Sequence, residues 1–435
     1  MNLAASLAKP IDRIKQKLND GFIRNLGWLG AAEIINRVFR LVTTVVLARF
    51  LTAYDYGLAA LVLTTYEFTQ AFARIGIGGK VIQADEESLE SICNGAYWLN
   101  WVVCLGLFII QCIAAFPVAW FYNDNQLIMP ICLLSTIYLV TPIGRIQTAL
   151  IQRENRLKIT AVSSSIQLAV GNILTAVFAA LGMGMWAIIL PRILVAPLDA
   201  LISLAYHSWR PKKGFTTERW REIFTFGISI LGTSLLGTLR NNLDYLIVGR
   251  FVGVKALGVY YFAFNAGLGI SFSIIQSITV ALYPHLCAAR SDLAKFQQCY
   301  LKSLKTIATI IIPFVLLQSS LAPLYVPIIF GRQEWVAAIP ILILICLSAI
   351  PRPFGIASSY LLLAMGKPNL ALKWDIWFTV IFAGGLVLGA QWQPGNLETL
   401  GVAIAVLVTH LIFIPVFTLW STRYVFGANK SLRAV

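Results

Sequence analysis

The sequence predicts an all-α polytopic membrane protein with twelve transmembrane helices in two six-helix bundles, related by a parallel internal repeat. Composition is the first observation behind this prediction. Hydrophobic residues make up 58% of the 435 residues and charged residues 12%, whereas a soluble domain carries about 25% charged residues. Mean hydropathy is +0.77. The second observation is that hydrophobic stretches fill the chain, and the third is that short motifs of the first half recur in the second.

Each hydrophobic stretch approaches or exceeds the roughly 20 residues that a helix needs to cross about 30 Å of hydrocarbon. In chain order the predicted spans are 23–50, 56–82, 91–121, 127–144, 159–181, 185–207, 223–248, 257–283, 307–330, 337–365, 372–390 and 399–420. In the segment 1–22 before them, leucines and isoleucines recur at helical spacing. We expect this segment to be an amphipathic helix on the cytoplasmic membrane surface.

The distribution of basic residues predicts the orientation. With a cytoplasmic N-terminus, 25 of the 34 Lys and Arg residues fall in inner loops or at the inner ends of spans. The positive-inside rule therefore places both termini in the cytoplasm of a cell whose inner membrane holds the protein. This distribution also accounts for the net charge of +15. Because the basic residues are spread along the whole inner side, no nucleic-acid partner is expected.

The first helices of the two halves carry matching motifs at their outer ends. Arg-Phe-Leu at 49–51 followed by Gly57 matches Arg-Phe-Val at 250–252 followed by Gly258, at an offset of 201 residues. Six spans per half is an even number, so both halves enter the membrane in the same direction. Parallel repeats of this kind are arranged around an axis along the membrane normal, with a cavity between them.

A second match lies in the fourth span of each half, where Pro-Ile-Gly at 142–144 corresponds to Pro-Phe-Gly at 353–355. The repeat divides the chain into five predicted parts. They are the N-terminal segment 1–22, an N-terminal bundle at 23–207, a cytoplasmic linker at 208–221, a C-terminal bundle at 222–421 and a cytoplasmic tail at 422–435.

Arginines inside the spans are the candidate substrate-binding residues: Arg37, Arg40, Arg192, Arg240 and Arg352. An Arg near the bilayer centre costs roughly 2.5–3.5 kcal/mol even on a lenient insertion scale, so such residues usually have a function. The equivalent first spans of the two halves both carry Arg. If both face one central cavity, that cavity is cationic and suits an anionic substrate, and Arg is the side chain best suited to bind phosphate.

Structural roles for these charges are the alternative. Glu33 with Arg37, and Arg240 with Asp244, are spaced one helical turn apart and could form ion pairs. Arg192 could extend its side chain to the interface, and Arg352 could lie near the mouth of its span.

Two acidic residues in the spans, Glu67 and Asp244, are candidates for coupling transport to an ion. A carboxyl group in a cavity of low dielectric constant can take up a proton on one side of the membrane and release it on the other. The three histidines are scattered, and the seven cysteines lack the spacing of a metal site. No metal, cofactor or catalytic residue is therefore predicted. Tryptophans, Trp335 among them, are expected in interfacial belts.

Several motifs resemble those of a known family. They are Leu-Ala-Arg-Phe-Leu-Thr at 47–52, Asp-Tyr-Gly at 55–57, Ile-Gly-Ile-Gly at 75–78, Gly-Met-Gly-Met-Trp-Ala at 182–187, Asp-Tyr-Leu-Ile-Val-Gly-Arg at 244–250 and Leu-Gly-Val-Tyr-Tyr at 257–261. Together they resemble bacterial polysaccharide flippases, which are the O-antigen and exopolysaccharide transporters of the multidrug/oligosaccharidyl-lipid/polysaccharide exporter superfamily. The resemblance covers essentially the whole chain.

The resemblance implies a flippase that moves a polyprenyl-pyrophosphate-linked oligosaccharide from the cytoplasmic to the outer leaflet by alternating access of a central cavity. It also implies contact with membrane lipids and with enzymes of polysaccharide assembly. One alternative is a cation-coupled drug exporter of the same superfamily, which a cationic cavity suits poorly. Another is a membrane polysaccharide polymerase. The predicted outer loops are too short to hold a catalytic domain, so a transporter is favoured over an enzyme.

Overall fold

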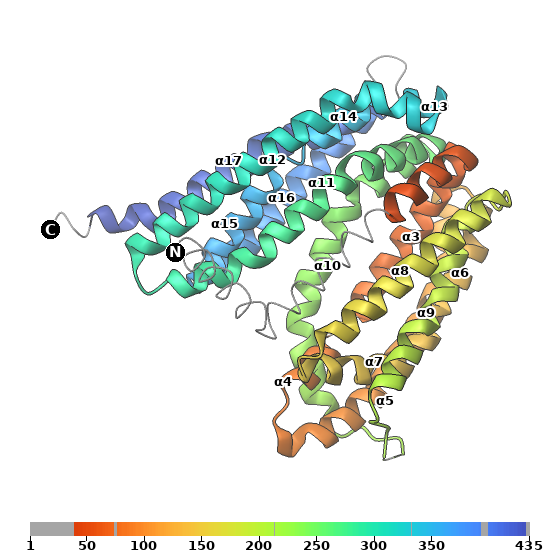
Figure 1. Ribbon diagram of the computed structural model, residues 1–435, viewed down its shortest axis with the longest axis vertical. Helices are drawn as coiled ribbons and strands as arrows, with labels where there is room; N and C mark the ends of the chain where they lie inside the picture. Colours follow the sequence, from red (N-terminus) through yellow and green to blue (C-terminus); the bar gives the residue numbers. More distant parts are fainter. Residues whose placement is uncertain (1–38, 74–75, 213, 332, 393–398, 432–435) are drawn as a thin grey trace, which may run out of the picture. The chain divides into compact units, whose positions relative to one another are not determined.

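The described part of the chain is all-helical. The computed structural model describes residues 39–73, 76–212, 214–331, 333–392 and 399–431, and no strand occurs among them (Figure 1). The predicted N-terminal amphipathic segment and most of the first span, including Glu33 and Arg37, lie outside the described residues.

In the first half, residues 39–50 are helical. The helices that follow are α3 (Ala53–Ala73), α4 (Ile77–Gln83), α5 (Glu86–Tyr122), α6 (Ile128–Ser135), α7 (Ile137–Arg153), α8 (Leu157–Ala180) and α9 (Trp186–Tyr206). A short 3-10 turn, η1 (Asn125–Leu127), precedes α6.

The second half begins with α10 (Trp220–Phe251), whose first two residues lie in the predicted linker. The remaining helices are α11 (Val254–Ala289), α12 (Leu293–Phe330), α13 (Gln333–Val336), α14 (Ile339–Leu347), α15 (Arg352–Ala364), α16 (Pro368–Gln391) and α17 (Leu400–Ser431). Several are longer than the predicted spans because hydropathy marks only the part of a helix in hydrocarbon. For example, α12 begins at Leu293, where the Asp292 carboxylate accepts the backbone N–H groups of Ala294 and Lys295.

Within the described residues, eight helices or consecutive helix runs are long and apolar enough to cross a membrane, and nine if the bent pair in α10 is counted as one span. The protein is therefore a multi-pass membrane protein. Large apolar side chains also remain exposed on the helices, as at Ile113, Trp120, Leu317 and Ile328. Such surfaces are unusual on soluble proteins and are normal against lipid tails.

Three predicted spans are broken, and one of them, 127–144, is divided at Thr136 between α6 and α7. The predicted span 56–82 is divided between α3 and α4, and Gly76 before α4 has a positive φ of 37°, a conformation that glycine adopts without steric cost. The predicted span 337–365 is interrupted after α14, and α15 starts afresh at Arg352, directly after Pro351. Discontinuous helices of this kind often form binding sites in membrane transporters.

Two compact units make up the chain, and each is described by itself. Unit 1 contains residues 1–46, 69–116 and 128–232, and unit 2 contains 47–68, 117–127 and 233–435. The two units differ from the two sequence halves, because α3, α5 and α10 each contribute residues to both units. In unit 1, α4, α5, α7 and the first turn of α10 share an apolar core that includes Val81, Ile92, Ile146 and Ile223.

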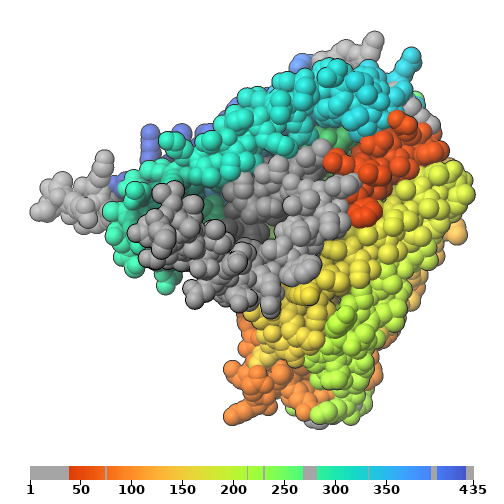
Figure 2. Space-filling model, viewed as in Figure 1, coloured from red at the N-terminus to blue at the C-terminus, as the bar shows by residue number. Residues whose placement is uncertain are grey.

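The core of unit 2 contains Trp335, which corrects the prediction of an interfacial position for this residue. Trp335 is 0% exposed, and its indole N–H donates to the carbonyl of Ala48 at 2.7 Å. Its ring lies against Tyr56 and Phe262, with centroid separations of 5.2 and 4.2 Å. Hydropathy could not reveal this, because a tryptophan near the end of a span is equally typical of an interfacial belt and of a packed core. Figure 2 shows the segment before α3 at the surface beside the end of α12, where Arg49 donates to the Ile329 carbonyl.

Candidate functional site

Helix α10 carries four polar side chains between positions 240 and 244 in unit 2, and three of them, Arg240, Asn242 and Asp244, contact other helices. Successive residues of an α-helix are rotated by about 100°, so Arg240 and Asp244 lie on one face and Asn242 on the opposite face. Each of the three reaches a different helix. α10 is therefore the centre of a polar network in a part of the chain that is otherwise apolar.

Arg240 forms an ion pair with Asp375 of α16, in which Nη1 lies 2.5 Å from Oδ1. This differs from the expected pairing with Asp244 on the same helix. An i,i+4 pair on one helix is worth only about 0.2–0.5 kcal/mol, so a carboxylate on a neighbouring helix can easily take its place. The Arg240 and Asp375 side chains are 30% and 39% exposed, so solvent or a ligand can reach the pair.

Asp244 is buried, with 3% of its surface exposed. The phenolic O–H of Tyr260, from α11, donates to Oδ2 at 2.9 Å, and the backbone N–H of Tyr245 donates to Oδ1 at 3.0 Å. The carboxylate also attracts the guanidinium of Arg352. A buried carboxylate needs such partners, because a buried unpaired charge is very costly.

Arg352 is the first residue of α15, directly after the break in the predicted tenth span. Its Nε is buried and has no hydrogen-bond partner among the described residues. The N-terminus of a helix carries a partial positive charge, which adds to the charge of the guanidinium. Arg240 also lies within electrostatic reach, so two arginines and one helix N-terminus concentrate positive charge in this region. Such a concentration favours an anion.

His410 of α17 belongs to the same network, although the sequence pattern had marked it as isolated. It is buried, and its Nδ1 lies 2.8 Å from the Val406 carbonyl, to which it donates. The rings of Phe378 and Phe382 pack edge-on against it, each with a centroid separation of 5.2 Å. Both Arg240 and Arg352 lie within electrostatic reach of the imidazole.

Sequence analysis also missed Asp375. It lies near the start of the predicted span 372–390. The useful signal for His410 and Asp375 is the rarity of ionisable residues in spans, which marks any such residue for attention.

The opposite face of α10 connects to α3. The Asn242 side-chain amide donates to Glu67 at 3.0 Å, and its carbonyl oxygen accepts the Thr64 hydroxyl at 3.3 Å. Asn242 is buried and Glu67 is partly buried. The two predicted coupling residues, Glu67 and Asp244, therefore both lie in unit 2. Glu67 contacts the face of α10 that is opposite to the face carrying Asp244.

The other predicted site residues lie elsewhere. Arg40 is exposed on the helical segment 39–50, and Arg192 is exposed on α9 of unit 1. Near Arg192 in sequence, Asp199 accepts hydrogen bonds from Ser163 at 3.0 Å and Gln167 at 3.1 Å, both on α8. Asp199 thus joins two helices of unit 1.

A reciprocal contact between glycines lies at the N-terminal ends of α3 and α11 in unit 2. A Cβ on Gly57 would overlap the Val254 carbonyl oxygen, and a Cβ on Gly258 would overlap the Ala53 carbonyl oxygen. Gly57 and Gly258 are 201 residues apart, and so are Ala53 and Val254, which is the offset of the repeated motif. Equivalent residues therefore meet each other symmetrically, as expected around a local two-fold axis.

The second repeated motif shows the same kind of equivalence. A Cβ on Gly144 of α7 would meet the Ala200 backbone of α9 at 2.6 Å, and one on Gly355 of α15 would meet Ile414 of α17 at 3.2 Å. In both halves the glycine of the predicted fourth span faces the predicted sixth span. The glycines recur in the sequence because equivalent helices cross closely there.

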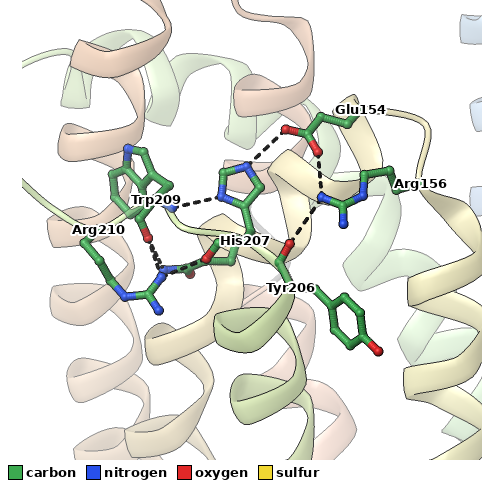
Figure 3. Close-up of polar contacts among 7 residues, drawn as sticks. Glu154, Arg156, Tyr206, His207, Trp209 and Arg210 are labelled. Carbon is green, nitrogen blue, oxygen red and sulfur yellow. Dashed lines mark hydrogen bonds and ion pairs between the residues drawn. The ribbon is translucent and has the colours of Figure 1, made fainter.

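Unit 1 carries a cluster of charged residues around the C-terminal end of α9 (Figure 3). His207 accepts the Trp209 backbone N–H at Nδ1, so its Nε2 carries a proton and donates to Glu154 at 3.2 Å. Arg156 donates to the other oxygen of Glu154 and to the Tyr206 carbonyl, while Arg210 donates to carbonyls at the helix end. These cations satisfy carbonyl groups that the end of a helix leaves free.

The hydrogen bond from Arg156 holds the pKa of Glu154 below its ordinary value, with a smaller contribution from His207. A lowered carboxyl pKa stabilises the fold above the pKa of the unfolded chain, about 4.3. That stability is lost as pH falls through the folded-state pKa. The cluster therefore holds the end of α9 at neutral pH. Across the described ranges, no group of three or more His, Cys, Asp or Glu side chains could hold a metal ion.

The residues predicted as a linker are held on unit 1. The Trp209 carbonyl accepts Gln147 of α7 at 3.1 Å, and the Trp220 indole donates to the Gly95 carbonyl of α5 at 2.9 Å. Ser91 of α5 donates to Glu218 at 2.7 Å. A freely flexible tether would lack such contacts.

Two solved structures with a similar fold are membrane transporters. An inward-facing multidrug resistance transporter of the MATE family, in the MOP superfamily, covers 90% of this chain and 95% of its own at a TM-score of 0.74 and 15% identity. The lipid II flippase MurJ in an inward closed conformation covers 91% of this chain and 87% of its own at a TM-score of 0.69 and 14% identity. The described part of this chain therefore shares the all-helical fold of these transporters.

Three relatives in sequence have names that refer to polysaccharides. The teichuronic acid biosynthesis protein TuaB of Bacillus subtilis (strain 168) is 25% identical over 93% of this chain and 83% of its own. The lipopolysaccharide biosynthesis protein WzxC of Escherichia coli (strain K12) is 26% identical over 91% and 80%. The succinoglycan biosynthesis transport protein ExoT of Rhizobium meliloti (strain 1021) is 22% identical over 84% and 74%.

These similarities confirm the prediction of a membrane transporter in place of an enzyme. The family model for polysaccharide biosynthesis proteins matches residues 46–340, which is more than half of the sequence and includes the polar residues of α10. The chain therefore belongs to the polysaccharide biosynthesis protein family.

Proposed function

We propose that the protein is a flippase that moves a polyprenyl-pyrophosphate-linked oligosaccharide from the cytoplasmic to the outer leaflet of the inner membrane. The observation that carries the proposal is Arg352 at the N-terminus of α15, with Arg240 within electrostatic reach, in a membrane-embedded unit. Such a site can bind the negatively charged pyrophosphate group. The names of the relatives TuaB, WzxC and ExoT support a polysaccharide precursor as the cargo.

The proposed mechanism is alternating access between two six-helix bundles, at 23–207 and 222–421, with twelve helices in total. The symmetric contact of Gly57 with the start of α11, and of Gly258 with the start of α3, supports the repeat on which this mechanism depends. In this proposal the contact closes the outer side while the substrate enters from inside. Its separation opens the outer side.

The arginines have distinct proposed roles. Arg240 and Arg352 bind the pyrophosphate in the C-terminal bundle, and Arg37, Arg40 and Arg192 provide positive charge in the N-terminal bundle. The prenyl tail stays in the hydrocarbon of the bilayer and needs no contact with a charged residue. Membrane lipids and enzymes of polysaccharide assembly are the proposed partners. A cation-coupled drug exporter remains the second candidate because of the MATE-like fold, but paired arginines disfavour a cationic cargo.

Glu67 and Asp244 are the proposed coupling residues. The Tyr260 hydroxyl and the Arg352 guanidinium both stabilise the ionised form of Asp244. A phosphate that draws Arg352 away would favour protonation of that carboxylate. Substrate binding and proton uptake are thereby linked through one arginine.

Transport in proteoliposomes tests the function and the coupling together. We expect the wild-type protein to move a fluorescent polyprenyl-pyrophosphate oligosaccharide across the bilayer, and to do so several-fold faster under an imposed pH gradient. Asp244→Asn should lose the response to the gradient, because the amide cannot exchange a proton. The readout is the fraction of fluorophore that a membrane-impermeant quencher reaches over time.

Empty liposomes and liposomes that contain Asp199→Asn are the controls, since Asp199 is an intramembrane carboxylate outside the proposed machinery. A wild-type protein that moves only lipophilic cations would overturn the flippase proposal. Transport by Asp244→Asn that responds to the gradient as the wild type does would remove the coupling role alone.

The orientation gives a separate prediction. In intact cells, a membrane-impermeant maleimide should label a cysteine placed at Asn125, which is exposed in the turn between α5 and α6, and should not label one placed at Lys212. The reason is the positive-inside bias, which puts Lys212 on the cytoplasmic side. The wild type, with its seven native cysteines, sets the background, and permeabilised cells confirm that Lys212→Cys can react. Strong labelling at position 212 before permeabilisation would reverse the topology.

A further inference from the structure

Asp375 occupies the position that an anionic ligand of Arg240 would need. Its Oδ1 lies 2.5 Å from Nη1, and among the described residues no other hydrogen-bond partner accompanies this guanidinium. An arginine offers five N–H donors and binds phosphate best through two parallel bonds. The contact with Asp375 uses one nitrogen only, so the pair is not the strongest that Arg240 could form.

The two carboxylates of the network differ in how firmly they are held. Asp244 is buried and receives a tyrosine hydroxyl and a backbone N–H. Asp375 is 39% exposed, and its side chain has no hydrogen-bond donor besides Arg240 in the described part of the chain. Asp375 can therefore leave its partner by rotating its side chain toward solvent, whereas Asp244 would leave two donors and a guanidinium unsatisfied.

Charge balance gives a reason for the arrangement. Two arginines and two aspartates make the region neutral when no ligand is bound. Without Asp375, an excess positive charge would stand in a membrane-embedded unit, which is costly. A pyrophosphate brings more negative charge than one carboxylate and can use the unoccupied donors of Arg240. Arg352, whose buried Nε has no partner among the described residues, lies within electrostatic reach of Arg240 and adds to the attraction for an anion.

We propose that Asp375 is a built-in counter-anion that holds the ligand position on Arg240 when the site is empty and is exchanged for the pyrophosphate of the substrate. The inference rests on the proposed function, because it identifies the ligand as a pyrophosphate. The exchange makes the site selective: an anion with a single charge gains little by replacing a carboxylate that is already in place. It also provides for release, because the carboxylate returns and competes with the ligand.

The test is ligand binding by the purified full-length protein in nanodiscs, with farnesyl pyrophosphate as the probe. We expect Asp375→Asn to bind the probe about tenfold more tightly than the wild type, equivalent to about 1.4 kcal/mol, because the competing charge is gone. Asp375→Glu should bind it with nearly wild-type affinity, because the carboxylate is retained. Arg240→Gln should lose affinity with or without the Asp375 substitution. The readout is the dissociation constant from isothermal titration calorimetry.

Asp199→Asn is the matched control, because it removes an intramembrane carboxylate that is bonded to Ser163 and Gln167 and not to an arginine. Its affinity for the probe should equal that of the wild type. If Asp375→Asn is folded, as judged by gel filtration and thermal unfolding, and binds the probe equally or more weakly, the exchange is wrong. A melting temperature that falls by the same amount in Asp375→Asn and Asp375→Glu, with no gain in affinity, would show a purely structural role.

The same variants distinguish this inference from the proposed function. Proteoliposomes that fail to move the lipid-linked oligosaccharide, together with tighter binding by Asp375→Asn, would refute the flippase and keep the anion exchange. Normal transport by the wild type, with no change in affinity on removal of the carboxylate, would refute the exchange and leave the flippase intact. If both hold, Asp375→Asn should also transport more slowly than the wild type, because the ligand is released more slowly.

Discussion

Gly258→Val is expected to abolish transport. A Cβ at this position would overlap the Ala53 carbonyl oxygen and lie 2.9 Å from the Gly57 backbone nitrogen. Overpacking ordinarily costs about 1–3 kcal/mol. The cost here should exceed that range, because the obstacle is backbone and cannot change its rotamer. The start of α11 and the start of α3 could then no longer approach, so the proposed closed outer side would not form.

Transport in proteoliposomes and thermal unfolding in detergent measure the effect. Gly57→Val should give the same result, because a Cβ on Gly57 would overlap the Val254 carbonyl in the reciprocal contact. Gly384→Val is the matched control: it lies on α16 of the same unit, and a Cβ there has nothing within 4 Å. Transport by Gly258→Val at the wild-type rate would show that the close glycine contact is dispensable.

Asp244→Ala is expected to destabilise the protein strongly. It removes the buried acceptor of the Tyr260 hydroxyl and the carboxylate that attracts Arg352. Asp244 attracts the Arg352 guanidinium without a direct ion pair, so the loss should stay at or below the roughly 3–5 kcal/mol that breaking a buried ion pair costs. We expect the midpoint of thermal unfolding to fall by several degrees or more and export of polysaccharide to stop.

A second substitution checks the cause. Replacing Arg352 with glutamine in the Asp244→Asn background should recover part of the stability that Asp244→Asn alone loses, because no buried charge then remains uncompensated. Asp199→Ala serves as the comparison and should cost less, since its partners Ser163 and Gln167 are neutral. Equal losses in Asp244→Ala and Asp199→Ala would mean that the charge of Arg352 plays no part.

Much of the architecture follows from the sequence, because hydrophobic length and loop charge are local properties. Span positions agree with α5, α8, α9 and α16 to within about five residues. The break between α14 and α15 could not be placed in the same way, because hydropathy is the same on both sides of Pro351. The repeated glycines could be recognised as a repeat, yet nothing in a one-dimensional pattern says that Gly57 and Gly258 face each other's helices.

The candidate site was predictable only in part. Arg240, Arg352 and Asp244 stand out because charge is rare in spans. Their partners do not, because ion pairs between helices depend on rotation and packing. Arg240 pairs with Asp375 on α16 at a separation of 135 residues, and not with Asp244 one turn away. His410 similarly gains its significance from a position near two arginines that lie on other helices.

The sequence by itself determined that this is a multi-pass membrane protein, which family it belongs to and which rare charges lie within its spans. Each of these depends on composition, on motifs or on the cost of burying a charge, and none depends on how the helices pack. The tertiary structure decided the partners of those charges, the reciprocal glycine contact and the burial of Trp335. These features depend on which helix surfaces contact each other. Close packing decides those contacts, and it brings together residues that are far apart in the chain.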